Sequence, residues 1–160
     1  FDLHVLPGCR VLEVIRLDSG VLHIRAEVRA RSGCCPDCGQ RSSAVHSCSV
    51  RCPADLPCLG REVRLELAVR CLYCRNPACS RRTFVEWLPG LVAPRARRTH
   101  RLATAQDRVG VALGGAAGAR LLGHLGMSVS GATVLRLVRR LPLPRGQPSH
   151  ATVLSAIKRL

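Results

Sequence analysis

Aromatic residues are scarce in this sequence. One Trp, one Tyr and two Phe make up 2% of its 160 residues, so few bulky side chains are available to fill a hydrophobic core. A small domain with so little apolar surface to bury needs another source of stability. A structural zinc ion supplies on the order of 10–16 kcal/mol of folding free energy. The scarcity of aromatic residues therefore favours a metal-stabilised fold.

Acidic residues nearly disappear from the second half of the chain. Residues 1–90 contain 13 Lys or Arg and 9 Asp or Glu, whereas residues 91–160 contain 12 and 1. After Glu86 the one acidic residue is Asp107, so that half offers no carboxylate pair or triad to hold catalytic magnesium. We therefore expect this chain not to be an enzyme. The unbalanced arginines indicate a polyanionic partner, with double-stranded DNA the first candidate and a merely solvated basic surface the alternative.

Long apolar runs are also lacking. The most apolar stretch, residues 109–119, is too short to cross a bilayer and is followed by Arg120 and His124. The sequence therefore predicts no membrane partner.

Cysteine, in contrast, occurs ten times, and four of these residues form two short turns. In the first turn, Cys35-Pro36-Asp37-Cys38-Gly39, the proline fixes φ before the bend and the glycine can adopt the positive φ that follows it. The second turn is Cys74-Arg75-Asn76-Pro77-Ala78-Cys79. Four thiolates, each about 2.3 Å from the metal, make a closed tetrahedral zinc site with no position for a reacting water. We predict a structural zinc ion bound by Cys35, Cys38, Cys74 and Cys79.

Two alternatives to this metal site stay open. Cys34 in place of Cys35 is a second register for the first turn, although its turn chemistry is poorer. A secreted disulfide scaffold is the other alternative, and it predicts unfolding by a reductant and indifference to a chelator. Cys48 and Cys52 have no matching second pair, and we interpret them as incidental thiols rather than a second site.

Alternating apolar residues predict strands in the first half of the chain. A hairpin is expected over residues 11–17 and 21–28, joined by Asp18-Ser19-Gly20. The clearest alternation covers residues 61–72 and leads straight into Cys74, and a short strand is expected over residues 82–86. Together with the cysteine turns, these strands predict a small zinc-ribbon-like antiparallel β domain over residues 1–90.

Helical periodicity replaces the strand pattern after a basic linker predicted at residues 91–100. Apolar residues at spacings of three and four predict helices over residues 102–113 and 116–125, and Ser130 is a good N-cap for a third helix that ends before Pro142. We interpret the glycines between residues 110 and 118 as a small-residue helix contact. Residues 101–144 are thus predicted to form an all-α helix-turn-helix domain and residues 145–160 a poorly ordered tail, which makes the chain α+β.

A helix-turn-helix places its last helix in the major groove, where the N-terminal residues of that helix meet base edges. We therefore predict that Ser130, Thr133 and Arg136 read bases and that Arg139 and Arg140 contact phosphates. Further DNA contacts are expected from the basic linker, at Arg95, Arg97 and Arg98. An ordinary helical hairpin with an arginine-rich wet side is the alternative. The sequence leaves the oligomeric state open, a homodimer included.

A resemblance to a known family is carried by two sets of motifs. The segments CPDCG, LPCLGREVRLELAVR, CRNPACSRRTF and the LPG at 88–90 resemble the N-terminal zinc finger of bacterial insertion-sequence transposases of the ISL-three family. The following segments, ATAQDRVGVALGG and ARLLGHLGMSVSGATVLRLVRRLP, resemble the helix-turn-helix that those enzymes carry next. The likeness runs from about residue 9 to residue 144, and the two sets of motifs occur in the family's order.

The resemblance implies sequence-specific binding to the terminal inverted repeats of a mobile element, in the bacterial cytoplasm at the nucleoid. It also implies a following catalytic domain of RNase H-like fold with an Asp-Asp-Glu triad. After Pro148 this chain reads SHATVLSAIKRL, without an acidic residue, so we expect a truncated DNA-binding part without that domain. Two rivals stay open: a regulator or remnant that binds DNA without a role in transposition, and a zinc-stabilised protein-interaction module.

Overall fold

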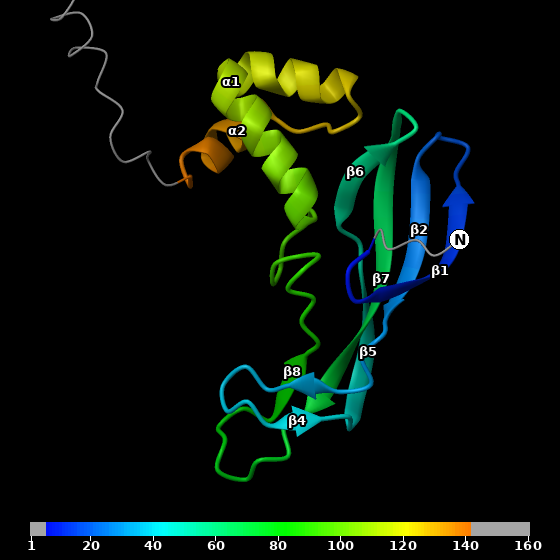
Figure 1. The fold of residues 1–160 in the computed structure, drawn as a ribbon, viewed down its shortest axis with the longest axis vertical. Coiled ribbons are helices and arrows are strands. Elements are labelled where there is room, and N and C mark those ends of the chain that lie inside the picture. The colour runs from blue at the N-terminus through cyan, green and yellow to red at the C-terminus, as the bar shows by residue number, and fades with distance from the viewer. Residues whose placement is uncertain (1–5, 142–160) are drawn as a thin grey trace, which may run out of the picture.

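The computed structural model describes residues 6–141, which fold into eight strands and two helices (Figure 1). The helices are α1 (His100–His124) and α2 (Gly131–Val138). The α+β class predicted from the sequence is confirmed, and no helix within residues 6–141 is long and apolar enough to cross a membrane. The strands are β1 (Cys9–Arg16), β2 (Leu22–Val28), β3 (Gly33–Cys34), β4 (Arg41–Ser42), β5 (Val45–Arg51), β6 (Ala54–Cys58), β7 (Arg61–Tyr73) and β8 (Thr83–Val85).

Strand β7 is the centre of the main sheet. It is 13 residues long, and its alternating apolar residues Val63, Leu65, Leu67 and Val69 are all buried. Strands β5 and β6 pair antiparallel with one edge of β7, while β2 and then β8 pair with the other edge. Strand β1 extends the sheet by pairing antiparallel with β2, and β3 and β4 form a separate two-stranded sheet.

The prediction of a purely antiparallel sheet is wrong, because β2 and β7 are parallel in a register that runs from Leu22 opposite Val63 to Glu27 opposite Ala68. The reason lies in the two cysteine turns. After β2 the chain enters the first turn and returns along β5, and after β7 it enters the second turn (Figure 1). Two neighbouring strands that run in the same direction deliver both turns to the same end of the molecule.

The main core lies on one face of β7. Its alternating apolar residues pack against Leu6, Cys9, Leu88, Leu91 and Val92. Arginine and glutamate side chains of β1, β2 and β7 instead form ion pairs: Arg10–Glu27, Arg25–Glu13, Arg25–Glu66 and Arg64–Glu62. The sheet therefore buries the apolar residues of its strands, and the charged residues that alternate with them form ion pairs.

Residues 91–100, predicted as a basic linker, pack on the sheet. Leu91 and Val92 belong to the main core. The Ala54 N–H donates to the Arg97 carbonyl at 2.9 Å, and the Thr99 N–H donates to the Ala54 carbonyl at 2.9 Å. The segment is basic, as expected, but backbone hydrogen bonds to β6 hold it in place. The predicted tail, residues 145–160, and the predicted last residues of the helix-turn-helix lie outside the described residues.

The helical part contains two helices in residues 6–141, where the sequence predicted three. Residues 102–113 and 116–125 were expected as separate helices, but α1 spans nearly all of both. The backbone bends inside α1 at Gly114, with φ 72° and ψ −170°, and glycine adopts this conformation without a Cβ clash. The two predicted helices therefore join at a bend instead of a loop.

Glycines allow α2 to approach α1 closely, as predicted for the stretch between residues 110 and 118. A Cβ built on Gly110 would lie 2.7 Å from Val134 Cγ1 and 2.8 Å from Val138 Cγ2, and a Cβ on Gly115 would lie 2.7 Å from Leu135 Cγ. Only a residue without a side chain fits at such contacts. The small-residue helix contact predicted from the sequence is confirmed.

The glycine contact gives a matched pair of substitutions in one helix. We expect Gly110→Ala to destabilise the protein by about 1–3 kcal/mol, because the new methyl group collides with two stiff valines. Gly123→Ala makes the same change where the new Cβ meets no atom within 4 Å outside its own stretch of helix, so it should stabilise by up to about 1 kcal/mol through helix propensity. Urea unfolding followed by circular dichroism measures both. A stabilising Gly110→Ala would contradict the close packing.

Candidate metal centre and predicted DNA-contact residues

The first cysteine turn is closed by its own backbone. The Cys35 N–H donates to the Gln40 carbonyl and the Gly39 N–H donates to the Cys35 carbonyl, each at 2.9 Å. Gly39 has φ 72°, the left-handed conformation predicted for it. Because β3 and β4 flank this turn, both of its cysteine sulfurs are held in place by paired backbone on either side.

The second turn follows β7. The Cys74 N–H donates to the Arg82 carbonyl at 2.8 Å, and the Cys79 N–H donates to the Asn76 carbonyl at 3.1 Å. The Asn76 side chain accepts a hydrogen bond from the Ala78 N–H at 3.0 Å, which is the local turn that asparagine favours. The Asn76-Pro77 dipeptide thus shapes the bend between the two sulfurs.

The four predicted ligands converge. The sulfurs of Cys35, Cys38, Cys74 and Cys79 all lie within 4.8 Å of one another, with 4.0 Å between Cys35 and Cys79 and 3.6 Å between Cys38 and Cys74. Sulfurs at about 2.3 Å from a tetrahedral zinc ion are about 3.8 Å apart. All four thiols are free of disulfide bonds. The arrangement therefore fits a metal ion held by four thiolates.

The same geometry distinguishes Cys35 from its neighbour Cys34. Cys35 is 2% exposed and belongs to the group of four, whereas Cys34 is exposed, lies in β3 and is outside the group. The structure therefore brings Cys35, and not Cys34, together with the other three sulfurs. Cys48 and Cys52 belong to no group of three or more metal-ligating side chains among residues 6–141.

A small second core surrounds the sulfurs. Leu72 and Phe84 are buried against Cys35 and Cys79, with Cys74 packed at the edge. This cluster contains one of the few aromatic residues and is separate from the main core. We call the two cysteine turns and this second core the metal end. It buries little apolar surface, so we expect its stability to depend on a bond between the sulfurs and a metal ion.

The thiols differ in proton affinity. A hydrogen bond from the Gln40 backbone lowers the pKa of Cys38 to about 7. The Asn76 backbone lowers the pKa of Cys74, but burial and the hydrogen bond shared with Cys38 outweigh it and raise that pKa to about 12. Cys38 therefore ionises more readily than Cys74, and a metal ion displaces the protons of the thiols that it binds.

Glu86 connects the metal end to the main sheet. Its Oε2 accepts hydrogen bonds from the Arg70 N–H and from Arg70 Nε, each at 2.9 Å, and its Oε1 pairs with an Arg70 terminal nitrogen. The same guanidinium also donates to the Ala30 and Arg31 carbonyls. The mostly buried Arg70 side chain therefore links β7 to the residue after β8 and to the segment before the first cysteine turn.

Some of the predicted DNA-contact residues are exposed arginines, and others form hydrogen bonds within the protein. Arg95, Arg97, Arg136, Arg139 and Arg140 are exposed. Ser130 is the N-cap of α2, as predicted, and its hydroxyl accepts from the Thr133 N–H at 3.3 Å and contacts the Thr133 hydroxyl at 3.0 Å. Arg98 is half-buried and donates to the side-chain oxygen of Gln106 at 2.5 Å. Five of the eight predicted contact residues are therefore arginines that are exposed to solvent.

A set of hydrogen bonds around Asp55 joins the sheet to the start of α1, and the sequence did not predict it. We call it the Asp55 joint. The buried Asp55 of β6 accepts hydrogen bonds through Oδ1 from Thr99 Oγ1 at 2.6 Å, from Arg101 Nε at 2.7 Å and from the Leu56 N–H at 2.9 Å. Its Oδ2 pairs with an Arg101 terminal nitrogen. Thr99 is the N-cap of α1, a local signal that the sequence does carry, but its partner lies 44 residues away.

Replacing Asp55 by its amide is expected to lower the stability of the fold substantially. Burial raises the pKa of Asp55, but hydrogen bonds from Arg101, Thr99 and the Leu56 amide lower it below its ordinary value. We expect Asp55→Asn to destabilise by about 2–3 kcal/mol at pH 7, because Arg101 then faces an amide. Glu13→Gln, at an exposed ion pair, should cost about 0–1 kcal/mol.

The pH dependence of the Asp55 contribution has a definite sign. The folded pKa lies below the unfolded value of about 3.9, so the contribution is complete above about pH 5 and is lost as the pH falls through the folded pKa. Urea unfolding of the wild type, Asp55→Asn and Glu13→Gln at pH 7 and pH 3, with a chelator present at both pH values so that the metal state is the same, measures it. A difference between wild type and Asp55→Asn that grew towards acid pH would contradict the ion pair.

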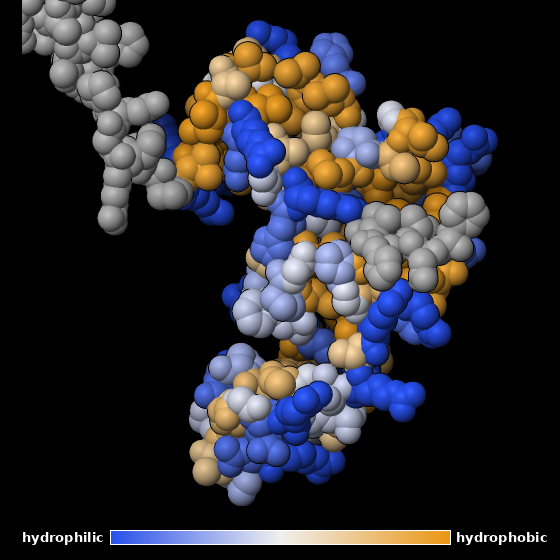
Figure 2. All heavy atoms as spheres, in the orientation of Figure 1, coloured by the Kyte–Doolittle hydropathy of each residue, from blue (hydrophilic) through white to orange (hydrophobic). Residues whose placement is uncertain are grey.

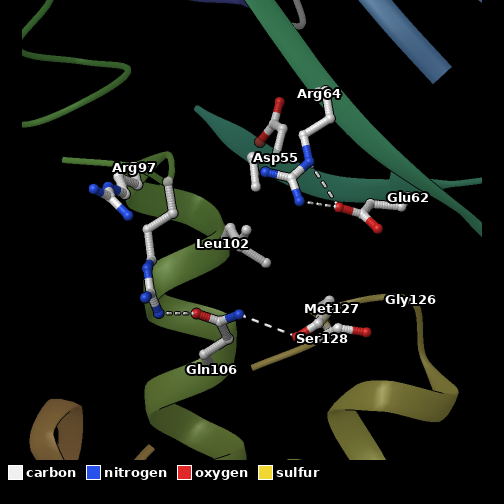
Figure 3. Close-up of a pocket in the computed structure, with 11 residues that line it drawn as sticks. Asp55, Glu62, Arg64, Arg97, Leu102, Gln106, Gly126, Met127 and Ser128 are labelled. Carbon is white, nitrogen blue, oxygen red and sulfur yellow. Dashed lines mark hydrogen bonds and ion pairs between the residues drawn. The ribbon is translucent and has the colours of Figure 1, made fainter. Parts of the chain in front are cut away.

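A cleft lies at this joint (Figure 3). It has a volume of about 180 Å³ and is bounded by β6, β7, residues 97–98, the first turns of α1 and the turn at residues 126–128. Gln106 spans it, with its oxygen accepting from Arg98 and its nitrogen donating to the Met127 carbonyl at 3.2 Å. The cleft is therefore lined by the sheet, α1 and the turn that leads to α2.

Comparisons with protein-family models, with curated proteins and with solved structures found no match to this chain.

Proposed function

We propose that this chain binds double-stranded DNA, with α2 in the major groove. The observation that carries the proposal is the surface of α2 and the residues that follow it. Arg136, Arg139 and Arg140 are exposed there, and no acidic side chain within residues 6–141 forms an ion pair with any of them. Three arginines without acidic partners among the described residues, on a short helix and just after it, favour a polyanion.

The order of the helical segments supports a helix-turn-helix. The bend at Gly114 divides α1 into two segments, and a turn from Leu125 to Val129 leads to the N-cap of α2. In such motifs the last helix enters the groove and its first turn meets base edges. Thr133 and Arg136 would then read bases, while Arg139 and Arg140 would contact phosphates.

We propose that zinc is the ion held by the four thiolates, with a structural role. Thiolates are the ligands that zinc takes in closed four-coordinate sites, and such a site keeps no open position for chemistry. The bound ion would hold both cysteine turns in place against Leu72 and Phe84. The metal end would then act as a rigid part of a DNA-binding unit.

The resemblance to ISL-three family transposases suggests the DNA target, the terminal inverted repeats of a mobile element. Fluorescence anisotropy with a terminal-repeat duplex and a scrambled duplex of equal length tests this. Specific binding should exceed non-specific binding by about 10³-fold or more at physiological salt. Equal affinity for the two duplexes would leave a DNA-binding protein but would remove the transposon end as its target.

A protein-interaction module is the second candidate, favoured by apolar residues on the helices. Val111 is 63% exposed, and Leu113, Leu121, Leu125 and Leu135 are exposed as well. Figure 2 shows hydrophobic residues gathered over the helical end of the molecule. Salt separates the two functions, because apolar association does not weaken with salt as phosphate binding does.

A further inference from the structure

The cleft at the sheet–helix joint contains three arginines that come from different parts of the fold. Arg64 belongs to β7, and Arg97 and Arg98 immediately precede α1. In Figure 3 the Arg64 side chain reaches into the cleft from the sheet, across from Gln106 and Leu102 of α1. A ligand in this space would touch the sheet and the helical part together.

Two carboxylates also line the cleft, and each already has a cationic partner. Both oxygens of Asp55 are engaged by Arg101, and Oδ1 also accepts from Thr99. Glu62 Oε1 accepts from Arg64 Nε at 2.7 Å and from one Arg64 terminal nitrogen at 2.6 Å. The second terminal nitrogen of Arg64 has no partner among residues 6–141. The acidic groups therefore do not cancel the charge of the remaining arginines.

Arg97 and Arg98 supply that remaining charge. Neither forms an ion pair within residues 6–141, and the Arg97 side chain is exposed at the edge of the cleft. Burial lowers the pKa of Arg98, and the charge of Arg140 lowers it further, while Asp107 partly offsets both. A half-buried guanidinium that lacks a direct carboxylate partner is stabilised by an anion beside it.

The cleft is also fixed in relation to α2. Gln106 holds Arg98 on one side and the Met127 carbonyl on the other, so the turn and the guanidinium are positioned by one side chain. Ser128 also lines the cleft, two residues before the N-cap Ser130. Anything bound in the cleft therefore lies next to the start of the helix proposed to enter the groove.

We propose that this cleft binds a phosphate group of the DNA backbone, held by Arg64, Arg97 and Arg98. The proposal rests on the proposed DNA binding and adds to it that the β-sheet takes part, through Arg64. Arginine forks match the geometry of phosphate oxygens, and contacts to phosphates fix the register of a protein on the duplex. The phosphate would thereby set the angle between the sheet and α2.

Arg64 has a matched control on the same sheet. Its side chain is 47% exposed and paired with Glu62, while that of Arg25 is 46% exposed and paired with Glu13 and Glu66, outside the cleft. Both Arg64→Gln and Arg25→Gln remove one charge and one exposed ion-paired arginine. In the zinc-loaded protein, Arg64→Gln should reduce the slope of log affinity against log salt for a duplex by about 1, and Arg25→Gln should leave it unchanged. Arg97→Gln should reproduce the effect of Arg64→Gln.

The source of the phosphate is tested separately with inorganic phosphate. At constant ionic strength it should shift the Ser128 amide resonance of the wild type, not that of Arg64→Gln, and a saturating duplex should abolish the shift. A shift that persists with duplex bound would mean a site for free phosphate and would overturn the proposal. Equal salt slopes for Arg64→Gln and Arg25→Gln would overturn it while DNA binding stands, whereas a wild type that binds no duplex would remove the proposed function itself.

Discussion

Cys35→Ser is expected to abolish tight metal binding and to unfold the metal end, whereas Cys34→Ser should leave both unchanged. The two residues are neighbours, but only the sulfur of Cys35 lies in the group of four. A structural zinc site contributes on the order of 10–16 kcal/mol to folding in small domains. Loss of one thiolate therefore removes more stabilisation than the small second core around the sulfurs can replace. Mutating a residue that only hydrogen-bonds to a metal ligand lowers metal affinity by roughly 10–100-fold. Because Cys35→Ser removes a ligand itself, the affinity for zinc should fall by more than this.

The measurement combines zinc content with circular dichroism on protein purified under reducing conditions. Wild type and Cys34→Ser should hold one zinc ion and lose β structure at the metal end when a strong chelator is added. A reductant alone should change nothing, which separates this account from a disulfide scaffold. Equal zinc content in Cys35→Ser and Cys34→Ser would contradict the assignment of the ligands.

The second large effect is expected in DNA binding. Between about 50 and 200 mM salt, a protein with six to ten phosphate contacts loses roughly 10³–10⁵ in affinity. We expect Arg139→Gln and Arg140→Gln each to weaken binding to every duplex and to reduce the salt slope by about 1, because both residues are proposed to contact phosphates. Arg136→Gln should instead reduce discrimination between target and scrambled duplex by about 1–3 kcal/mol.

Arg108→Gln is the control for these three variants. Arg108 is also an exposed helical arginine, but it belongs to α1. It should lower affinity only through the net charge and leave discrimination unchanged. An affinity that does not respond to salt in the wild type would remove the DNA hypothesis and leave the protein-interaction module.

The features that the sequence predicted well are determined by residues that are close together in the chain. The bend of each cysteine turn follows from Pro36, Gly39 and Asn76, and the start of α2 follows from the capping side chain of Ser130. The convergence of the two turns was predicted from the need of a metal for four ligands. Each of these features requires knowledge of only a few consecutive residues or of one chemical rule.

What the sequence did not predict depends on partners that are distant in the chain. Leu22 and Val63 pair in parallel because two cysteine turns have to reach the same end, and alternation alone does not give strand direction. The Asp55 joint links residues more than 40 positions apart. The bend at Gly114 was read as a gap between two helices, since a glycine-rich stretch lowers helix propensity whether or not the helix continues.

The central claim is that sulfurs from two distant turns bind one zinc ion, and zinc K-edge X-ray absorption tests it most directly. On protein purified under reducing conditions, the account predicts one shell of four sulfur atoms at about 2.3 Å from zinc, with no nitrogen or oxygen ligand. A first shell that includes light atoms, or protein that contains no zinc and keeps its fold in chelator, would contradict it.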